Sequence, residues 1–456
     1  MKHSKKCVRT KAATIPELRF QDQRLTSFAG LVVLQRFFQV IALKARLQKC
    51  FWQLSQGKIF DRATLFLQLV LHVLLGYREL RDAAHDQHDP LVQRVLGLKQ
   101  LPDVATLSRM LQQADQAAVD KLRRLLAEIV LERLQALALP RVTLDFDGSV
   151  QSTKRRAEGT AVGYNKKKKG ARSYYPLFCT LAQTGQVLSF LHRSGNVHDS
   201  NGAQAFILDC VRQVRARLPG AIVEVRMDSA FFSDEIVAAL QAQAVEFTIS
   251  VPFERFLELK QMIERRQHWS EIDDELSYFE AQWKPKSGPS CCRFLMIRTC
   301  AKQQHKGPVQ LNLFEPYAYG YEFKVIVTNK ALSAAAIVAY HSGRGSQEGV
   351  FGELKTQCQM DYIPVRTRLG NETYLLASVF AYNLIRELQM QLEPPARNTT
   401  RQRAALWTFE QVETFRRTTL QRAGRLSSSS GKLVLTFCAG KNLKQRVLQI
   451  FQALAA

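Results

Sequence analysis

The hydrophobic periodicity of this 456-residue chain changes at Pro140, and this change constrains the fold more than any other feature. Before Pro140, apolar residues recur every three or four positions, as in the segment 122–137, which is typical of helices. After Pro140 the period becomes two, and opposite sides of one strand become apolar and polar. The apolar side chains of this strand are Val142, Leu144 and Phe146, and the polar ones are Thr143, Asp145 and Asp147. The sequence therefore predicts a helical N-terminal part followed by a sheet.

Further elements follow in the order strand, hairpin, helix, strand, helix, strand. This order predicts a mixed α/β sheet with helices on both faces. The strands are expected at 176–182, 187–191, 221–227 and 245–251, and the helices at 202–218 and 233–243.

We expect five segments along the chain. A helical DNA-binding domain occupies 1–139. The α/β domain is divided into 140–251 and 331–395 by a β-rich insertion at 252–330, and a basic C-terminal region follows at 396–456.

The chain carries 64 Lys and Arg against 40 Asp and Glu, a formal net charge of +24. Nucleic acid suits such an excess better than a membrane surface, because closely spaced phosphates reward many Lys and Arg contacts through counterion release. A basic protein of another kind, such as one bound to the ribosome, is the alternative. Since 46% of the residues are hydrophobic, a wholly disordered chain is excluded.

The sequence contains no segment that is typical of a membrane span or a signal peptide. The longest apolar stretch, 63–75, is interrupted by Gln68 and His72 and falls short of the ~20 residues that a bilayer requires. The nine cysteines are scattered and form no C-x-x-C pair, which favours reduced thiols. We therefore expect a cytoplasmic, nucleoid-associated bacterial protein with no membrane partner.

Two carboxylates stand at the ends of expected strands. Asp147 ends one strand on its polar side, and Asp228 follows a nearly continuous apolar strand. Because the ends of neighbouring strands meet at one edge of an α/β sheet, these carboxylates are expected to share divalent cations. Asp145 lies on the same strand face as Asp147 and is an alternative ligand.

The segment 340–355 offers a third acid. On a helix, steps of about 100° per residue place Arg344, Glu348 and Lys355 within roughly 40° of one another. Glu348 would then bind metal while the two cations bind phosphate, with Arg344 either in the helix or in the turn before it. Glu353 would face away. A solvated amphipathic helix is the alternative explanation.

These motifs, in this order, resemble those of DDE insertion-sequence transposases. The similarity is strongest to insertion-sequence family 1380, within the insertion-sequence 4 superfamily, and covers about residues 100–390. It is carried by the runs 145–150, 163–177, 193–203 and 226–232 and by the spacing Tyr340-x3-Arg344-x3-Glu348-x6-Lys355, which resembles the Tyr-Arg-Glu-Lys signature.

The resemblance implies an RNase H-like (retroviral-integrase-like) catalytic fold in which Asp147, Asp228 and Glu348 hold two Mg²⁺ ions, with Mn²⁺ able to substitute. Such an enzyme binds the terminal inverted repeats of an insertion sequence, cleaves the ends and joins the freed 3′-OH to target DNA. Since paired ends have to be held together, we expect a homodimer on double-stranded DNA. The residues that the resemblance places near the cleaved end are Tyr340, Arg344 and Lys355.

Two other functions are consistent with the same motifs. An inactive or domesticated relative would bind terminal repeats without cutting them, although the presence of all three acids argues against it. A structure-selective nuclease would cut branched DNA without strand transfer, whereas the insertion of about 80 residues before Glu348 favours a transposase. No phosphate-loop spacing is found around Gly424 and Gly431, so we expect no NTP dependence.

Two further segments are candidates for DNA contact. A basic loop after the first strand suits a DNA backbone, with a solvated loop as the alternative. Trp283 in the insertion could stack on a flipped base, or belong to the core of the insertion. The candidate residues of the loop are Tyr164, Lys166, Lys167, Lys168, Lys169 and Arg172.

Overall fold

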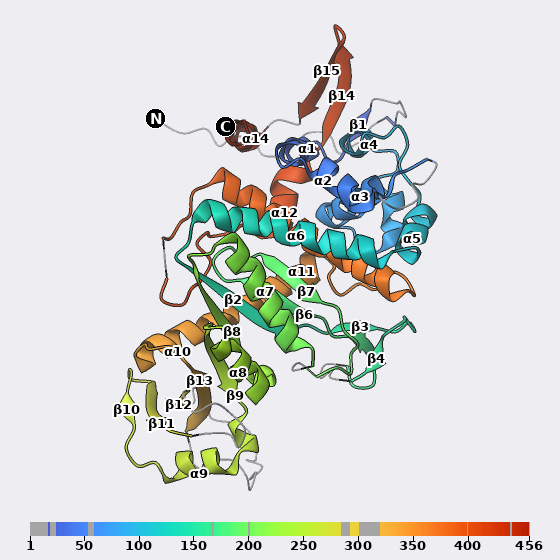
Figure 1. Ribbon diagram of the computed structural model, residues 1–456. Helices are drawn as coiled ribbons and strands as arrows, with labels where there is room; N and C mark the ends of the chain where they lie inside the picture. Colours follow the sequence, from blue (N-terminus) through green and yellow to red (C-terminus); the bar gives the residue numbers. More distant parts are fainter. Residues whose placement is uncertain are drawn as a thin grey trace, which may run out of the picture.

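In the computed structural model a protruding two-stranded ribbon, a helical part and a large sheet follow one another from top to bottom (Figure 1). Within the described residues, no helix is both long enough and apolar enough to cross a membrane. The structure describes residues 17–18, 24–52, 59–163, 165, 168–198, 201–283, 292–300, 320–398, 400–437 and 440–455.

The expected N-terminal helices form, and their ends follow from local sequence. Asp61 caps the central helix α3 by accepting a hydrogen bond from the Thr64 amide, and Gly76 ends it with a positive φ of 90°. The helices of this part are α1 (Leu31–Val40), α2 (Leu43–Phe51), α3 (Arg62–Leu75), η1 (Leu80–Ala84), α4 (Pro90–Leu96), α5 (Val104–Gln112) and α6 (Gln116–Leu137).

The helical part extends beyond residue 139. Helix α3 is buried on every side, and it packs against α12 (Arg368–Leu392), which is buried around most of its circumference. A helix that is apolar all round has to be enclosed by neighbours. Helix α12 provides this enclosure and also contacts α5 and α6. The N-terminal helices and α12 therefore share one hydrophobic core, so the boundary expected at 139 is not a packing boundary.

The central sheet has nine strands in the order β10-β11-β12-β13-β9-β8-β2-β6-β7. Strands β8 and β9 run parallel to β2, whereas β6 and β7 form an antiparallel hairpin beside it. The strands are β2 (Arg141–Gly148), β6 (Leu177–Leu181), β7 (Val187–Leu191), β8 (Ile222–Met227), β9 (Glu246–Val251), β10 (Ser270–Glu271), β11 (Leu276–Ala281), β12 (Arg293–Cys300) and β13 (Tyr321–Thr328).

The insertion expected at 252–330 is rich in strands, but it continues the central sheet instead of forming a subdomain of its own. Strand β13 pairs antiparallel with β9, with Val325 opposite Val251, and β12, β11 and β10 follow outward. This pairing satisfies the backbone groups that β9 would otherwise expose at a sheet edge. Phe294 and Met296 consequently join the same core as β8 and β9.

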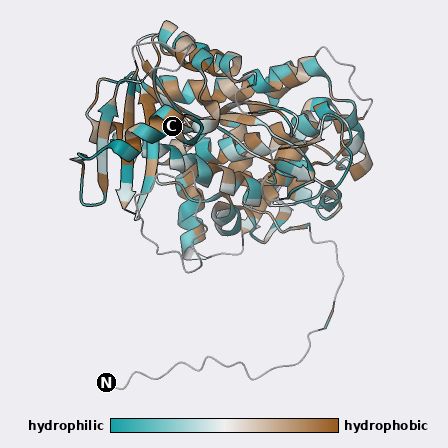
Figure 2. Cartoon of the chain, turned by 90° about the horizontal axis from the view of Figure 1, so that it is seen from below, coloured by the Kyte–Doolittle hydropathy of each residue, from teal (hydrophilic) through white to brown (hydrophobic). Residues whose placement is uncertain are grey.

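Helices cover both faces of the sheet, as the sequence predicts. On one face α7 (Ala203–Arg217) and α8 (Asp234–Ala242) pack on the apolar side chains of β2, β8 and β9. The opposite face carries α10 (Ala334–Ser342), η4 (Gly343–Gly345), α11 (Ser346–Gln357) and α12. Buried apolar side chains pack between these layers. Figure 2 shows that hydrophobic and hydrophilic residues are interspersed along the helices and strands.

Smaller elements complete the fold. A three-stranded sheet follows β2, in the order β3-β5-β4, and the C-terminal region forms a second small sheet with β1. The bounds are β1 (Leu25–Thr26), β3 (Gln151–Thr153), β4 (Ala161–Val162), β5 (Arg172–Tyr174), η2 (Ser229–Phe231), η3 (Phe253–Arg255), α9 (Leu257–Arg265), α13 (Val412–Phe415), η5 (Arg416–Leu420), β14 (Gly424–Ser429), β15 (Lys432–Phe437) and α14 (Lys441–Ala453).

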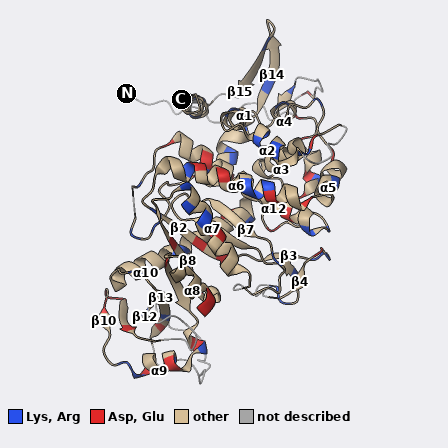
Figure 3. Ribbon diagram, in the orientation of Figure 1, with Lys and Arg blue, Asp and Glu red and all other residues tan. Residues whose placement is uncertain are grey.

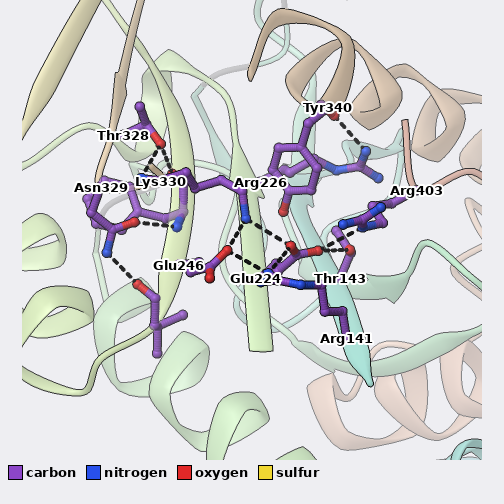
Figure 4. Close-up of polar contacts among 12 residues, drawn as sticks. Arg141, Thr143, Glu224, Arg226, Glu246, Thr328, Asn329, Lys330, Tyr340 and Arg403 are labelled. Carbon is purple, nitrogen blue, oxygen red and sulfur yellow. Dashed lines mark hydrogen bonds and ion pairs between the residues drawn. The ribbon is translucent and has the colours of Figure 1, made fainter. Parts of the chain in front are cut away.

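Glu224, at the centre of the sheet, collects charges from distant parts of the chain (Figure 4). The Glu224 carboxylate accepts hydrogen bonds from Lys330 Nζ at 2.8 Å, from Arg141 Nη1 at 2.8 Å and from Arg403 Nε at 3.2 Å. Glu246 binds Arg141 and Lys330 as well. A buried carboxylate is tolerated only with such compensation. The cluster therefore ties β2, β8, β9, the end of β13 and the segment around Arg403 together.

Glu224→Gln should lower the free energy of unfolding at pH 7 by about 3 kcal/mol, because it leaves buried cations without their main counter-charge. Burial by itself would raise the pKa of Glu224, but Lys330 and Arg403 lower this pKa to about 2. The contribution of ionised Glu224 to the free energy of unfolding is thus complete above the unfolded-chain pKa of about 4.3, and it is lost as the pH falls toward 2. Urea titrations at several pH values measure both effects.

The matched control is Glu271→Gln, on the exposed strand β10. It should change the unfolding free energy by less than about 0.5 kcal/mol. An acid dependence that is equally steep in wild type and Glu224→Gln would show that Glu224 does not supply this stability.

Candidate active site

Asp147 and Asp228 directly follow a register pair of two neighbouring parallel strands, at the carboxyl end of those strands. Phe146 on β2 pairs with Met227 on the parallel strand β8, so the two aspartates come next on neighbouring strands whose backbones are about 5 Å apart. Phe146 and Met227 point into the α7–α8 core, and alternation turns Asp147 to the opposite face. Asp228 leaves its strand by accepting a hydrogen bond from the Ala230 amide at 3.0 Å.

The segment that carries Glu348 is fastened over this edge. Arg344 lies in η4, the turn that leads into α11, and its Nη1 donates to Asp147 Oδ2 at 3.2 Å. Gln347 Nε2 donates to the main-chain oxygen of Asp145 at 3.1 Å. Glu348 follows in the first turn of α11, exposed and one helical turn beyond Arg344. Arg344 and Gln347 therefore hold the start of α11 against β2, and Glu348 lies on the solvent-exposed side of this helix.

The carboxylate oxygens at this edge are the donors that Mg²⁺ prefers. One oxygen of Asp147 is occupied by Arg344 and the other by the Gly148 amide. In the described part of the chain, no three His, Cys, Asp or Glu side chains lie close enough together to hold a metal ion. The residue types fit a Mg²⁺ site, and the convergence of Glu348 on the two aspartates stays a prediction.

Asp145 is not the alternative ligand that the sequence allows. It is almost completely buried, and its two oxygens accept from Arg226 Nε at 2.6 Å and from Arg226 Nη2 at 2.7 Å. Both oxygens are thus committed to a buried ion pair. Because Asp145 is buried and both of its oxygens bind Arg226, a metal ion at the end of this strand has only Asp147 to bind.

Arg226 joins the strands that lead to Asp147 and Asp228 to the end of α10, and sequence analysis missed it. Besides Asp145 on β2, its Nη1 donates to the main-chain oxygens of Tyr340 at 2.8 Å and Gln402 at 2.6 Å. One fully buried guanidinium therefore links β8, β2, the end of α10 and the segment around residue 402. A signal existed in the sequence: Asp145 and Arg226 have opposite charges, and each stands two residues before a candidate acid on one of two expected strands.

Tyr340 does not offer a surface to DNA, contrary to the expectation from the resemblance. Its side chain is 1% exposed and lies between the Arg226 guanidinium, 5.2 Å from the ring centroid, and Lys330 Nζ, 4.6 Å from it (Figure 4). Burial raises the pKa of Tyr340 well above its usual value. Cation–π contacts on both sides make Tyr340 a spacer between Arg226 and Lys330.

Two of the three side chains expected on one helix face, Glu348 and Lys355, belong to α11, whereas Arg344 precedes this helix in η4. Helix α11 is continuous from Ser346 to Gln357, so Glu348 and the half-buried Lys355 lie on the same side, about two turns apart. Glu353 does face away: it is buried, forms an ion pair with Arg386 and accepts from the Val412 amide at 2.7 Å. The contacts of Arg344 and Lys355 with DNA stay predictions.

The basic loop is connected to β2 through the small sheet that β3, β5 and β4 form. Lys168, Lys169 and Arg172 are exposed, and Arg172 also donates to Thr160 Oγ1 at 3.0 Å. Asn165 anchors the loop by donating to Ser152 Oγ at 2.7 Å. The remaining candidates, Tyr164, Lys166 and Lys167, lie outside the described residues.

Trp283 is a core residue, which corrects its expected stacking on a flipped base. Its indole Nε1 donates to Glu258 Oε2 at 2.7 Å, and its ring lies 5.0 Å from the rings of Phe256 and Phe294. Only 9% of Trp283 is exposed. An indole enclosed by two aromatic rings and a hydrogen bond has no free face on which a base can stack.

The chain matches the family described as "Transposase DDE domain group 1" over residues 10–456. No curated protein matches it. Among solved structures it is similar to the piggyBac transposase synaptic complex with hairpin DNA, with 11% identity over 92% of this chain and 85% of that chain and a TM-score of 0.39. A Mos1 transposase paired-end complex with the left transposon end shares 12% identity over 43% of this chain and 60% of that chain, with a TM-score of 0.17.

The similarity to the solved structures is too loose to carry an argument. The family match is different, because it extends from residue 10 to residue 456. It includes every strand and helix around Asp147 and Asp228, whose place at the end of β2 and β8 we call the acidic edge. The chain belongs to the family of DDE transposases described as Transposase DDE domain group 1.

Proposed function

We propose that this transposase binds the terminal inverted repeats of an insertion sequence, cleaves the ends and joins the 3′-OH to target DNA. The observation that carries the proposal is the placement of Asp147 and Asp228 at the ends of neighbouring parallel strands, with the start of α11 fastened over them. The strand order β7-β6-β2-β8-β9, with a three-stranded antiparallel part and two parallel strands, supports an RNase H-like catalytic fold.

In this proposal Asp147, Asp228 and Glu348 hold two divalent cations, Mg²⁺ or Mn²⁺. When bound, these ions supply Lewis-acid stabilisation at the attacking and leaving oxygens of the phosphodiester. Arg344 lies where a phosphate has to approach, and its guanidinium can exchange Asp147 for two phosphate oxygens. The basic loop, with Lys168 and Lys169, binds the backbone of the same DNA.

Two ends have to be held for a coordinated reaction, so we propose a homodimer on double-stranded DNA. The excess of 24 positive charges supports a DNA partner. None of the proposed steps involves an NTP.

Asp147→Asn and Asp228→Asn should each reduce Mg²⁺-dependent cleavage at least about 100-fold, because each removes a charge that balances the cations. The measurement is gel analysis of cleavage and strand transfer with a duplex taken from the DNA that flanks the reading frame. The control is Glu235→Gln, an exposed acid at the start of α8, which should leave the cleavage rate unchanged.

The same assay separates the other two functions. A wild-type protein that binds the duplex and never cuts it would favour an inactive DNA-binding relative. Cleavage of branched DNA without strand transfer would favour a nuclease.

Arg226→Lys should raise the Mg²⁺ concentration for half-maximal cleavage several-fold. A lysine keeps the charge, but it cannot make two parallel bonds to Asp145 and also hold two main-chain oxygens. Strands β2 and β8 and the end of α10 would then be held less firmly around the two aspartates, so cation binding would cost more free energy. Cleavage rates across a Mg²⁺ titration measure this effect.

A loss of overall stability would not move the Mg²⁺ titration of the folded fraction. The matched control is Arg133→Lys, because Arg133 likewise forms a two-fold ion pair, with Glu387 in the helical part. Arg133→Lys should leave the Mg²⁺ midpoint unchanged. An unchanged midpoint in Arg226→Lys as well would refute the positioning role of Arg226.

A further inference from the structure

Strands β14 and β15 form a ribbon that projects from the helical part, beyond α1 and α14 (Figure 1). Its base is anchored by β1, with Leu25 opposite Arg425. A two-residue turn closes its tip, where Ser430 and Gly431 have positive φ values of 49° and 75°. Such a turn matches the twist of a hairpin and keeps a two-stranded ribbon well defined.

The two faces of the ribbon differ in chemistry. Leu426 lies opposite Leu435 on the inner face, and both pack against the core of the helical part. Alternation places three of the six pairs on the outer face, where five of the six residues are exposed. These outer pairs are Arg425 with Thr436, Ser427 with Val434, and Ser429 with Lys432. The outer face is therefore cationic and rich in hydroxyl groups.

A groove of about 550 Å³ separates the inner face of the ribbon from α4. Leu426 and Leu433 line it on the ribbon side, and Arg24, Arg94 and Lys99 line it elsewhere. None of its lining residues is acidic. The three cations are exposed, so the groove presents positive charge to solvent next to the ribbon.

The surrounding sequence has the same sign of charge. From Thr414 to Ala456 the chain contains eight Lys and Arg and no Asp or Glu. Figure 3 shows basic residues at the base of β14 and no acidic residue on the ribbon. A polyanion can therefore approach both the ribbon and its groove without meeting a carboxylate on either.

We propose that the ribbon and its groove are a second DNA site, which reads the terminal repeat away from the acidic edge. The inference rests on the proposed function. The major groove of B-DNA accepts a two-stranded β-ribbon. With the ribbon in the major groove, the adjoining phosphate backbone lies in the channel beside α4 and contacts Arg94 and Lys99. Ser427, Ser429 and Val434 then face base edges, where hydroxyls bind donors or acceptors and a valine methyl contacts thymine.

The test uses the full-length protein and two variants, Arg94→Ala/Lys99→Ala and Ser427→Ala/Ser429→Ala. Fluorescence anisotropy is measured with a 30-bp duplex from the DNA flanking the reading frame and with a scrambled duplex of the same composition. The first variant should weaken binding to both duplexes equally and reduce the slope of log affinity against log salt by about 2. The second should weaken binding to the flanking duplex alone, by about fivefold or more.

The control is Arg212→Ala/Arg217→Ala on α7, which removes two exposed cations far from the ribbon and should leave affinity and salt slope unchanged. Thermal unfolding checks that each variant is folded. Unchanged affinity and salt slope in both Arg94→Ala/Lys99→Ala and Ser427→Ala/Ser429→Ala would overturn the inference. It would also be overturned if these variants bound DNA as the wild type does but had the molar mass of a monomer in light scattering where the wild type is a dimer.

Failure of the proposed function has a different outcome. It would appear as an absence of cleavage by the wild type, whereas failure of the ribbon site leaves wild-type cleavage intact and the variants without effect.

Discussion

The buried ion pair between Arg226 and Asp145 is the interaction on which the acidic edge depends. Charges without contact to water are costly unless every donor is satisfied, and here one guanidinium binds a carboxylate and two main-chain oxygens. Replacing such a pair by apolar residues is often neutral for stability. We therefore infer that the main role of the ion pair is to fix the positions of the elements that it joins. It fixes strands β2 and β8 and the end of α10 relative to one another, directly behind Asp147 and Asp228.

A second charged centre continues this arrangement across the same face of the sheet. Tyr340 separates Arg226 from Lys330, and Lys330 leads to Glu224 (Figure 4). The opposite face of the same strands is apolar and packs on α7 and α8. Strand alternation thus gives β2, β8 and β9 one face that is held by hydrophobic burial and one that is held by directed polar contacts. Directed contacts set positions more narrowly than burial does, and the acids lie at the edge of that face.

The helical part is connected to the acidic edge through α11 and α12. Helix α11 begins at the acidic edge, and the buried pair of Glu353 with Arg386 joins it to α12, which runs through the core of the helical part. The ribbon projects from the far side of that core. A duplex bound at the ribbon and a phosphodiester at the acidic edge would therefore be related through one continuous packed core.

Local patterns in the sequence determined the order of the main strands and helices, the position of Asp147 and Asp228 directly after a register pair of neighbouring strands, and the orientation of Glu353 away from Glu348. Periodicity and strand alternation are properties of short segments, so they can be read without the tertiary structure. Only the tertiary structure decided the burial of Tyr340 and Trp283, the commitment of Asp145 to Arg226 and the union of the insertion with the central sheet. Each of these depends on which distant segment supplies a partner, and the pattern of one segment does not specify which distant residue will meet it.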